Sequence, residues 1–479
     1  METAMEAEEI INENNVPERK RRRTLRYSVW DGCFYSLRVG AAETYFIPMM
    51  VAFGAGAFYV GVYTALPQLF VAFAQFASLF LVERYMVRKR IMVGLAIMQV
   101  LVVGSIFLMV SGGWFNPWLF IAIACAYFGF NGMTLPPWNS LMGDITTKAD
   151  RGVYFGKRNG LMQLVTFLSI LAGGVVLQHF SSAGGRQTGF SILIAIALAG
   201  TFGSAYSLIR HYEVPYRQPR DAGFTFGDFI RRSPRSNFAH FVFFISLINF
   251  ATQISSPFFP VYMLRDLKLN YAQYMLSQGI FIAAQFLAMR RWGPFSDRYG
   301  NRIVLRITGA FLPVLPMLWF FSTKLEYIVV IQVISGLTWG GWLLSSGNFI
   351  FDAVTPANRA RCAAYLNFFN GIGICLGALI GAFLSERIPS SFSLGTLSFS
   401  FLSPLETIFL ISGLLRFAVI FLFNPLVHEV RDVRKPNFKE VFVTLMHIKP
   451  LSGGILYFFT GVDHEKNGAG KGKENGEED

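Results

Sequence analysis

Residues 293–302 read Gly-Pro-Phe-Ser-Asp-Arg-Tyr-Gly-Asn-Arg, a polar and basic stretch between two long apolar runs. Gly293 and Gly300 supply the backbone freedom that a tight turn needs. Asp297 can stabilise the end of a neighbouring helix, and the arginines are typical of the cytoplasmic edge of a membrane. The stretch therefore predicts a short loop at a membrane surface, with a spanning helix on each side.

The whole chain carries more apolar surface than a soluble fold can bury. It has 479 residues, of which 53% are hydrophobic and 50 are Phe. A helix crosses a bilayer with about 20 apolar residues, and twelve such stretches recur between Trp30 and Asn424. The composition predicts an all-α integral membrane protein with twelve transmembrane helices.

Positive charge is concentrated on one side of these spans. The net charge is +13, but most Lys and Arg lie on inner loops and both tails. The predicted outer loops hold only Arg186, Arg265, Lys268, Lys324 and Arg387. This positive-inside pattern predicts cytoplasmic termini and favours a membrane topology over a nucleic-acid partner. We expect a protein of a bacterial inner membrane.

A linker rich in Pro and Arg divides the chain. Pro215, Pro219 and Pro234 interrupt any long helix there, and residues 224–229 are expected to form a short interfacial helix. The predicted parts are a cytoplasmic lead at 1–29, a six-helix bundle at 30–210, the linker at 211–237, a second six-helix bundle at 238–425, and a cytoplasmic tail at 426–479 that is disordered from about residue 463.

The sequence gives little support for chemistry other than transport. Its four cysteines, Cys33, Cys125, Cys362 and Cys375, have neither paired spacing nor His partners, so neither a disulfide framework nor a metal site is predicted. The sequence has no Gly-x-x-x-x-Gly-Lys loop for ATP and no acidic or His cluster with catalytic spacing. We expect no cofactor and no enzyme activity.

Polar residues recur at matched positions in the two halves. Offsets of 208 to 214 residues relate the members of each pair. The pairs are Gln68 and Gln278, Gln75 and Gln285, Asp144 and Asp352, Arg151 and Arg359, Asn159 and Asn367, and Glu83-Arg84 and Asp297-Arg298. Matched identities at a nearly fixed spacing indicate an internal repeat.

The pattern Gly-Pro-x-x-Asp-Arg-x-Gly-x-Arg at 293–302 resembles the signature loop of the major facilitator superfamily of transporters. Together with the repeat, the resemblance covers about residues 28–430. It implies two parallel six-helix pseudo-repeats around a site at the midplane. The copy in the first half is degenerate, because Glu83 replaces the Asp, and Leu79 and Met86 replace the glycines.

The resemblance also implies a gate on the cytoplasmic side. In the family, the acid of the loop docks at a helix of the opposite half, and the basic residue pairs with an acid at the inner end of the fourth or tenth span. By position, Asp297 would meet the start of span five, Arg298 would pair with Asp352, and Arg84 would pair with Asp144. The implied gate, which holds the outward-facing state, comprises Asp297, Arg298, Asp352, Arg359, Glu83, Arg84, Asp144 and Arg151. Alternatively, these charges set only topology and solvation.

Glu43 is the sharpest candidate for a coupling site. A carboxylate near the middle of a span costs roughly 2.5 to 3.5 kcal/mol on insertion and is usually functional or paired. It could carry a proton between the two sides, or it could form only a structural hydrogen bond. Arg38 lies five residues earlier, about 140° around an α-helix. We therefore expect both residues to find partners on other helices.

Further polar residues point to a substrate site at the midplane. Gln253 corresponds to Glu43 at an offset of 210, and Asn249 lies one turn before it. Spans one and seven line the cavity in the family, so these three residues are predicted to contact substrate. Further candidates are Gln68, Gln278 and Trp339. The alternatives are helix pairing for the glutamines and core packing for the Trp.

Two further features of the spans have no assigned chemistry. Arg416, deep in span twelve, is costly enough to suggest a partner or an anionic ligand, and its role stays open. Gly373, Gly377 and Gly381 form a stripe that is typical of close helix packing.

These features predict a secondary active transporter that moves a small organic solute by alternating access. Proton coupling through Glu43 is one option. The expected partners are the solute, protons and membrane lipids, and the protein should be a monomer. One alternative is a non-transporting receptor or scaffold of the same fold, with the tail from Asn437 as its docking element. Another is a lipid or lysolipid transporter.

The degenerate first copy of the loop leads to a test of the gate. Asp297→Asn should shift the protein toward the inward-facing state more than Glu83→Gln does, because Asp297 retains the short side chain and flanking glycines that tight docking needs. Rates of cysteine labelling at the cytoplasmic side of the cavity measure the shift. Equal rates in the two variants would show that the asymmetry has no functional meaning.

Overall fold

The computed structural model of the chain describes a helical body and two short strands. The described residues are 17–146, 151–180, 185–214, 226–232, 236–354, 359–388, 391–394, 397–400, 402–430 and 433. Met1–Asp432 form one compact unit, and Val433–Asp479 form a second. The predicted lead up to residue 16 and the predicted tail beyond residue 433 lie outside the described residues.

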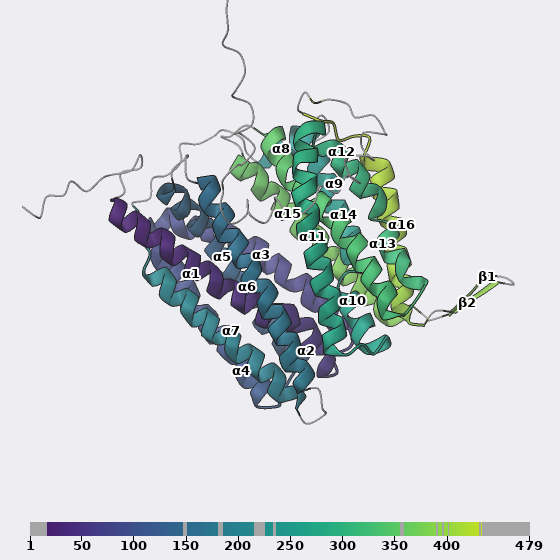
Figure 1. The fold of residues 1–479 in the computed structure, drawn as a ribbon. Helices are drawn as coiled ribbons and strands as arrows, with labels where there is room; N and C mark the ends of the chain where they lie inside the picture. Colours follow the sequence, from purple (N-terminus) through teal and green to yellow (C-terminus); the bar gives the residue numbers. More distant parts are fainter. Residues whose placement is uncertain are drawn as a thin grey trace, which may run out of the picture. The chain divides into compact units, whose positions relative to one another are not determined.

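The N-terminal half consists of helices joined by short turns (Figure 1). Its elements are α1 (Glu18–Ala41), the 3₁₀ turn η1 (Glu43–Tyr45), α2 (Phe46–Ala52), α3 (Ala57–Tyr85), α4 (Arg88–Ser111), α5 (Pro117–Ile145), α6 (Arg151–His179) and α7 (Arg186–Ile209). The linker contains α8 (Phe226–Arg232), close to the helix expected at 224–229. Phe229 of α8 packs against the rings of Tyr365 and Phe369, so the linker helix is tied to the second half.

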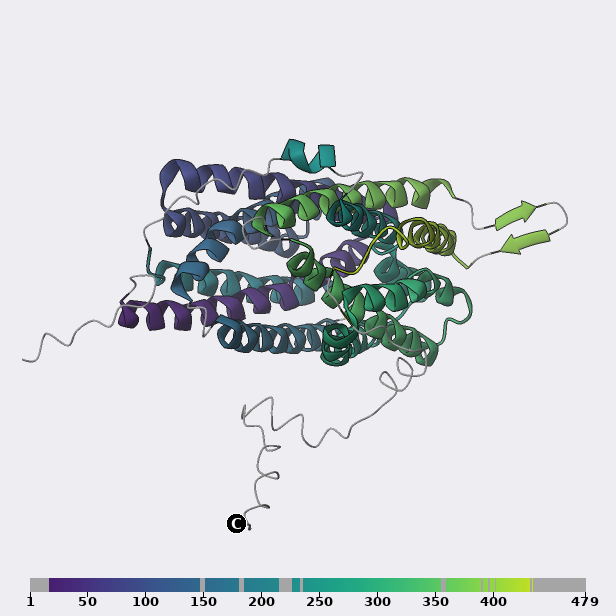
Figure 2. The same cartoon turned by 90° about the horizontal axis from the view of Figure 1, so that it is seen from above.

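The C-terminal half follows the same plan with more interruptions (Figure 1). Its elements are α9 (Asn237–Gln253), α10 (Phe258–Val261), the π-helical turn η3 (Tyr262–Asp266), α11 (Tyr271–Tyr299), α12 (Asn301–Phe311), α13 (Val314–Met317), the 3₁₀ turn η4 (Leu318–Phe320), α14 (Leu325–Ala353), α15 (Arg359–Arg387), β1 (Ser391–Leu394), β2 (Leu397–Ser400) and α16 (Pro404–Phe423). The two strands form an antiparallel hairpin that projects away from the helices (Figure 2).

Ten helices in the described part of the chain are long and apolar enough to cross a membrane. They coincide with ten of the twelve predicted spans. The other two predicted spans are helical but more polar: the first is divided among α1, η1 and α2, and the eighth is α11, which carries charged residues near its end. The prediction of an all-α integral membrane protein is confirmed, with the β1–β2 hairpin as an addition that the sequence did not reveal.

The first helix begins earlier than expected. α1 starts at Glu18 rather than at Trp30, so residues 18–29 of the predicted lead belong to the first helix. Arg21 donates hydrogen bonds to Glu18 in the first turn, and its Nε donates to the carbonyl group of Ile145 at the end of α5, at 3.1 Å. This extension is stabilised by polar contacts with another helix, so apolar periodicity did not reveal it.

The stretch 293–302 is not a loop. α11 continues through Pro294 to Tyr299, and α12 begins at Asn301, so Gly300 alone turns the chain. Gly300 has a φ of 91°, which glycine adopts without strain. The expected turn is therefore correct in position but only one residue long, and Gly293 lies within a helix.

The two halves meet at what we call the closed end, where α6 ends and α11 begins. α3 packs against α15, and α6 packs against α11. Gly61 approaches Ala382, and Gly174 approaches Met275, so closely that a Cβ on either glycine would clash. One continuous apolar core contains residues of both halves there. The helices of the two halves are thus joined tightly at this end (Figures 1 and 2).

The opposite end is different, and we call it the basic end because it holds the Arg-rich segments after α3 and α11. There the described residues of each half have their own apolar core. In Figure 1 the two groups of helices diverge toward this end. The two halves therefore share an apolar core at the closed end and have separate cores at the basic end.

Glycines of α15 bring it against α9, as their spacing predicts. A Cβ on Gly377 would lie 2.2 Å from the carbonyl oxygen of Phe250, and one on Gly381 would lie 2.3 Å from that of Ile254. A carbonyl oxygen of a helix backbone cannot move away as a side chain can. The two helices can pack at this distance only if these positions have no side chain.

Gly377→Ala should therefore lower the melting temperature of the purified protein. Overpacking of this kind costs about 1–3 kcal/mol. Gly104→Ala is the matched control, because Gly104 of α4 has open space where its Cβ would be. Thermal unfolding followed by intrinsic fluorescence measures both variants. Equal melting temperatures would contradict the close contact of α15 with α9.

Candidate functional site

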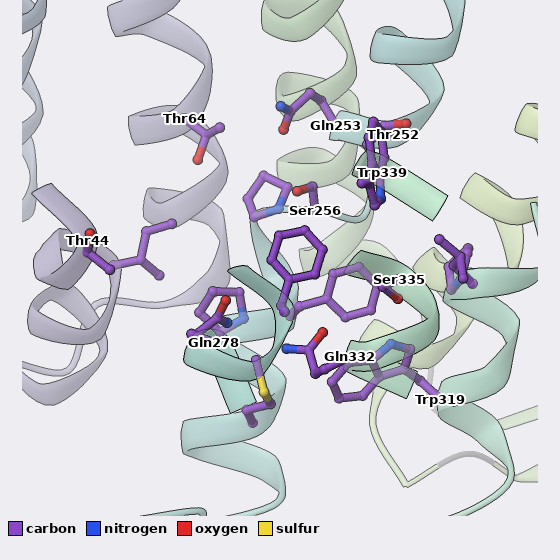
Figure 3. Close-up of a pocket in the computed structure, with 18 of the residues that line it drawn as sticks. Thr44, Thr64, Thr252, Gln253, Ser256, Gln278, Trp319, Gln332, Ser335 and Trp339 are labelled. Atoms are coloured by element: carbon purple, nitrogen blue, oxygen red, sulfur yellow. The ribbon is translucent and has the colours of Figure 1, made fainter. Parts of the chain in front are cut away.

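A cavity of about 650 Å³ lies between the two halves (Figure 3). From the N-terminal half, η1 and α3 contribute Glu43, Thr44 and Thr64. The second half contributes the other polar lining residues, which are Asn249, Thr252, Gln253, Ser256, Gln278, Gln285, Gln332, Ser335 and Arg416. Trp319 and Trp339 add aromatic walls on the same side (Figure 3). Sites for small organic molecules are commonly about 300–1,000 Å³.

Glu43 lies where the first span is interrupted. α1 ends at Ala41, and η1 precedes α2. Pro48 favours the interruption, because its ring would clash with the carbonyl group of Thr44 in a regular helix. The Glu43 carboxylate accepts a hydrogen bond from the hydroxyl group of Tyr127 on α5, and its side chain is 15% exposed.

Glu43 and Arg38 are paired, contrary to the expectation from a continuous helix. Arg38 Nε lies 4.0 Å from Glu43 Oε1. The interruption at Ala42 changes the direction of Glu43 relative to α1, so the angle of a regular helix does not apply. Arg38 is 2% exposed. It also donates to the side-chain oxygens of Gln99 at 2.5 Å and Asn131 at 3.5 Å.

Arg38 also lines a second cavity of about 310 Å³ within the N-terminal half. Asp31 and Arg158 line it as well, and Asp31 accepts a hydrogen bond from Ser204 at 2.6 Å. Glu43 thus faces the central cavity while its partner faces the smaller one. A change in the charge of Glu43 would therefore alter the interactions of Arg38 at the smaller cavity inside the N-terminal half.

Most of the predicted substrate residues lie around the central cavity. The lining includes Glu43, Asn249, Gln253, Gln278 and Trp339. Gln68 is not part of the lining and lies instead at the contact of α3 with α15, next to Gly371. Trp342, one turn beyond Trp339, packs in the core against the ring of Phe244. Contact with substrate remains a prediction for each of these residues.

Sequence reasoning overlooked several lining residues. Gln332 and Ser335 are three residues apart on α14, and helical spacing puts them on one face, so the sequence did contain this signal. Trp319 lies in η4, and no local pattern indicated it. Arg416 lines the cavity from α16, although no sequence pattern placed span twelve beside it.

No group of three or more His, Cys, Asp or Glu side chains that could hold a metal ion occurs among the described residues. The four cysteines are free thiols.

Arg88 organises the basic end of the N-terminal half. It is the first residue of α4, and its side chain is 1% exposed. Its guanidinium lies 2.7 Å from Asp144 and 3.9 Å from Glu213, and it donates to the carbonyl group of Val214 at 2.9 Å. Arg84, which the resemblance pairs with Asp144, is exposed instead. The residue that begins the helix, and not the residue before the turn, pairs with the acid.

His211 follows α7 at the same end. Burial lowers the pKa of its imidazole, so the ring is neutral at pH 7. The neutral ring can donate from Nδ1 to the carbonyl group of Ser207, at 2.9 Å. His211 therefore adds no charge to the Arg88 cluster near neutral pH.

The second half repeats this arrangement with an amide. Asn301, the first residue of α12, donates from Nδ2 to Asp352 at 2.7 Å. Asp297 and Arg298 are exposed, and Arg298 lies over the ring of Tyr299. In the described part of the chain, the expected pair of Arg298 with Asp352 is not formed in this conformation. The side chains of the other predicted gate residues, Glu83, Arg151 and Arg359, lie outside the described residues.

A glutamate beyond the last helix of each half caps another helix. Glu213 accepts from the backbone N–H of Lys89 at 2.5 Å, and Glu429 accepts from that of Arg302 at 2.8 Å. Both N–H groups belong to the first turn of a helix, where no helical acceptor is available. These matching hydrogen bonds support the internal repeat at the level of individual contacts.

Comparison with known proteins agrees with this architecture. Residues 240–462 match the sequence model of the Major Facilitator Superfamily. The efflux pump azaK of Aspergillus niger is 32% identical over 107 residues, which are 22% of this chain and 23% of the relative. The tetracycline resistance protein, class B, of Escherichia coli is 33% identical over 122 residues, which are 25% of this chain and 28% of the relative. The chain therefore spans about a quarter of the length of these curated relatives.

Solved structures extend the likeness over most of the chain. A mutant of the nucleoside transporter NupG superposes with a TM-score of 0.64 at 14% identity, over 85% of this chain and 100% of that chain. A bacterial homologue of the human lysosomal transporter Spinster, in an inward-facing and unoccupied conformation, superposes with a TM-score of 0.60 at 14% identity, over 85% and 95% of the two chains. At this identity the likeness concerns the fold alone.

The fold and the cavity define a polytopic membrane protein built from two related helical halves around a central site. A match of residues 240–462 to the model of the Major Facilitator Superfamily, and a fold similar to those of solved transporters, agree with this architecture.

The Arg88 cluster leads to a test at the basic end. Arg88→Gln should destabilise the protein by about 1.5–3 kcal/mol, because hydrogen bonds to charged groups are lost and the carbonyl group of Val214 loses its donor. Arg84→Gln is the matched control and should change stability by less than about 0.5 kcal/mol, because Arg84 is exposed. Thermal unfolding in detergent compares them. A larger effect of Arg84→Gln would restore the pairing that the resemblance implies.

Proposed function

We propose that the protein is a secondary active transporter that moves a small organic solute, chemically unchanged, by alternating access. The observation that carries the proposal is the polar cavity of about 650 Å³ between two halves that are joined at the closed end. Such a site can face one side of a membrane and then the other when the halves rock around it. We expect it to act as a monomer and not as an enzyme.

The basic end is, in this proposal, the cytoplasmic end. The distribution of Lys and Arg supports this orientation, with both termini in the cytoplasm. The membrane would be a bacterial inner membrane. The described conformation is then inward-facing, since the halves are tied at the opposite end. The exposure of Asp297 and Arg298 agrees with a cytoplasmic gate that has opened. In the outward-facing state, Asp297 would dock at the start of α6.

Glu43 is proposed to couple transport to protons. Its side chain lines the central cavity and is partly exposed, so a proton can reach it. When it is ionised, Arg38 and Tyr127 stabilise its charge. When it is protonated, the attraction to Arg38 is lost, and Arg38 can change its contacts with Gln99 and Asn131. A proton on Glu43 would thus alter the packing of α1 against α4 and α5.

The lining of the cavity favours a polar solute over a lipid. Threonine side chains line it from the N-terminal half, and glutamine, threonine and serine side chains line it from the second half (Figure 3). A lipid tail would be expected to lie against an apolar wall. A non-transporting receptor or scaffold remains the second candidate. Its signalling would depend on the tail from Asn437, so truncation there would abolish signalling. The full-length protein would show no solute flux.

Glu43→Gln tests the coupling. The variant should retain solute exchange but lose accumulation driven by a pH gradient in proteoliposomes, because glutamine cannot carry a proton. Glu406→Gln is the matched control: Glu406 accepts a hydrogen bond from Tyr262, much as Glu43 does from Tyr127, but it does not line the cavity. Candidate solutes come from a thermal-shift screen of metabolite classes. Gradient-driven accumulation that survives in Glu43→Gln would eliminate the coupling, and the absence of flux in the unmodified protein would support the scaffold.

A further inference from the structure

Arg416 is a buried cation in the wall of the central cavity. It lies on α16, is 2% exposed and belongs to the cavity lining. Its Nη1 donates to the carbonyl group of Leu312 at 3.0 Å, and its Nη2 donates to the hydroxyl group of Ser255 at 2.9 Å. Its Nε has no hydrogen-bond partner among the described residues.

The contact with Leu312 explains how the arginine is held. In a regular helix the Leu312 carbonyl group would accept from the backbone N–H of residue 316, but residue 316 is Pro and has no N–H. Arg416 supplies the missing donor from another helix. On its other side, Ser255 donates to Ser412, one turn before Arg416 on α16, and so is fixed in place. The guanidinium is thus positioned by two neutral groups, the carbonyl group of Leu312 and the hydroxyl group of Ser255.

No described carboxylate lies within ion-pair distance of Arg416. The acid on its own helix, Glu406, is ten residues earlier, about 15 Å along the helix axis, and it accepts a hydrogen bond from Tyr262. The other charged residue of the cavity, Glu43, pairs with Arg38. An arginine cannot release its proton in a protein. Its positive charge is therefore uncompensated in a place where an unpaired charge costs several kcal/mol.

The charges around the cavity do not cancel. Glu43 and Arg416 are its only charged lining residues in the described part of the chain. The charge of Glu43 is already balanced by Arg38, which lies behind it. The cavity is therefore positive on the side of Arg416. The complement of such a site is an anion, and a guanidinium with free N–H groups matches the planar or tetrahedral oxygens of an oxyanion.

We propose that the transported solute carries an oxyanion group, a carboxylate or a phosphate, and that Arg416 is the residue that binds it. The proposal rests on the transport function inferred above and adds the class of solute. The anion would complete the hydrogen bonds of the guanidinium that Leu312 and Ser255 leave open. The uncharged part of the solute would lie toward Trp319 and Trp339, which, like Arg416, line the cavity from the second half.

Paired probes test this on the purified full-length protein. The probes are benzoate with benzamide, indole-3-acetate with indole-3-acetamide, and phenyl phosphate with phenol. Binding is measured by thermal shift and by quenching of intrinsic Trp fluorescence. We expect at least one anionic probe to bind at least tenfold more tightly than its neutral partner, and the carboxylate and phosphate arms separate the two kinds of oxyanion. No preference for the anion in any pair, including no binding at all, would overturn the proposal.

Three variants assign the preference to Arg416. Arg416→Gln should remove it, and Arg416→Lys should retain part of it, because Lys keeps the charge without the planar donors. Arg306→Gln, which removes an exposed arginine of the same half, should leave it unchanged. An anion preference that survives in Arg416→Gln would place the site elsewhere and refute the assignment.

Ser255→Asp covers the case in which the Arg416 variants fail to fold. This change puts a carboxylate where Arg416 Nη2 now meets a hydroxyl group, at 2.9 Å, so it supplies an internal counter-ion. Binding of the anionic probes should fall at least tenfold while their neutral partners are unaffected. Unchanged anion binding in a folded Ser255→Asp variant contradicts the proposal.

The binding and flux experiments test the oxyanion site and the transport function independently. Anion binding without flux in proteoliposomes would contradict the transport function and leave the oxyanion site standing. Flux of neutral solutes without any anion preference would contradict the oxyanion site and leave transport standing.

Discussion

Inside a bilayer, a backbone or charged group that lacks a regular helical partner must find another one within the protein. This constraint explains the irregular segments around the cavity. Where Pro48 disturbs the first span, Glu43 leaves the helix axis and is held by Arg38. Where Pro316 withholds an N–H, Arg416 donates to the carbonyl group that is left. Each interruption therefore lies beside a charged side chain of the cavity, and at the second one that side chain also satisfies the backbone carbonyl group that Pro316 leaves without a donor.

The two halves obey the same constraint at the basic end but use different residues. In both, an acid from the fourth or tenth span meets the first residue of the helix after the turn. That residue is Arg88 in the first half and Asn301 in the second. The half whose signature loop is degenerate thus has the stronger contact, because both partners are charged there, whereas in the second half only the acid is charged. A firm anchor in the first half can compensate for the loss of glycines in its loop.

Much of the architecture could be predicted, because span length and charge distribution depend on the bilayer and not on details of packing. The helices follow the expected spans closely, and the glycine stripe of α15 packs as its spacing indicates. Two assumptions failed. Treating the first span as a regular helix separated Arg38 from Glu43, and assigning Gly293 to a turn made residues 293–302 a loop, although α11 continues to Tyr299. Contacts between distant segments, such as Gln332 with the cavity, follow only from the packed fold.

The balance between conformations follows from what each end buries. When the closed end is shut, apolar side chains of both halves are buried against each other and do not contact water. Each buried CH₂ contributes about 0.8 kcal/mol. In the proposed transport cycle, closing the basic end would make polar gate contacts of about 0.3–1 kcal/mol each. The empty protein should therefore rest with the closed end shut, which is the described conformation. The return to the other state needs a ligand that binds that state more tightly. The proposed binding of an anion to Arg416 and the proposed protonation of Glu43 would both act on charges at the cavity, where the two halves meet, and so could supply this difference.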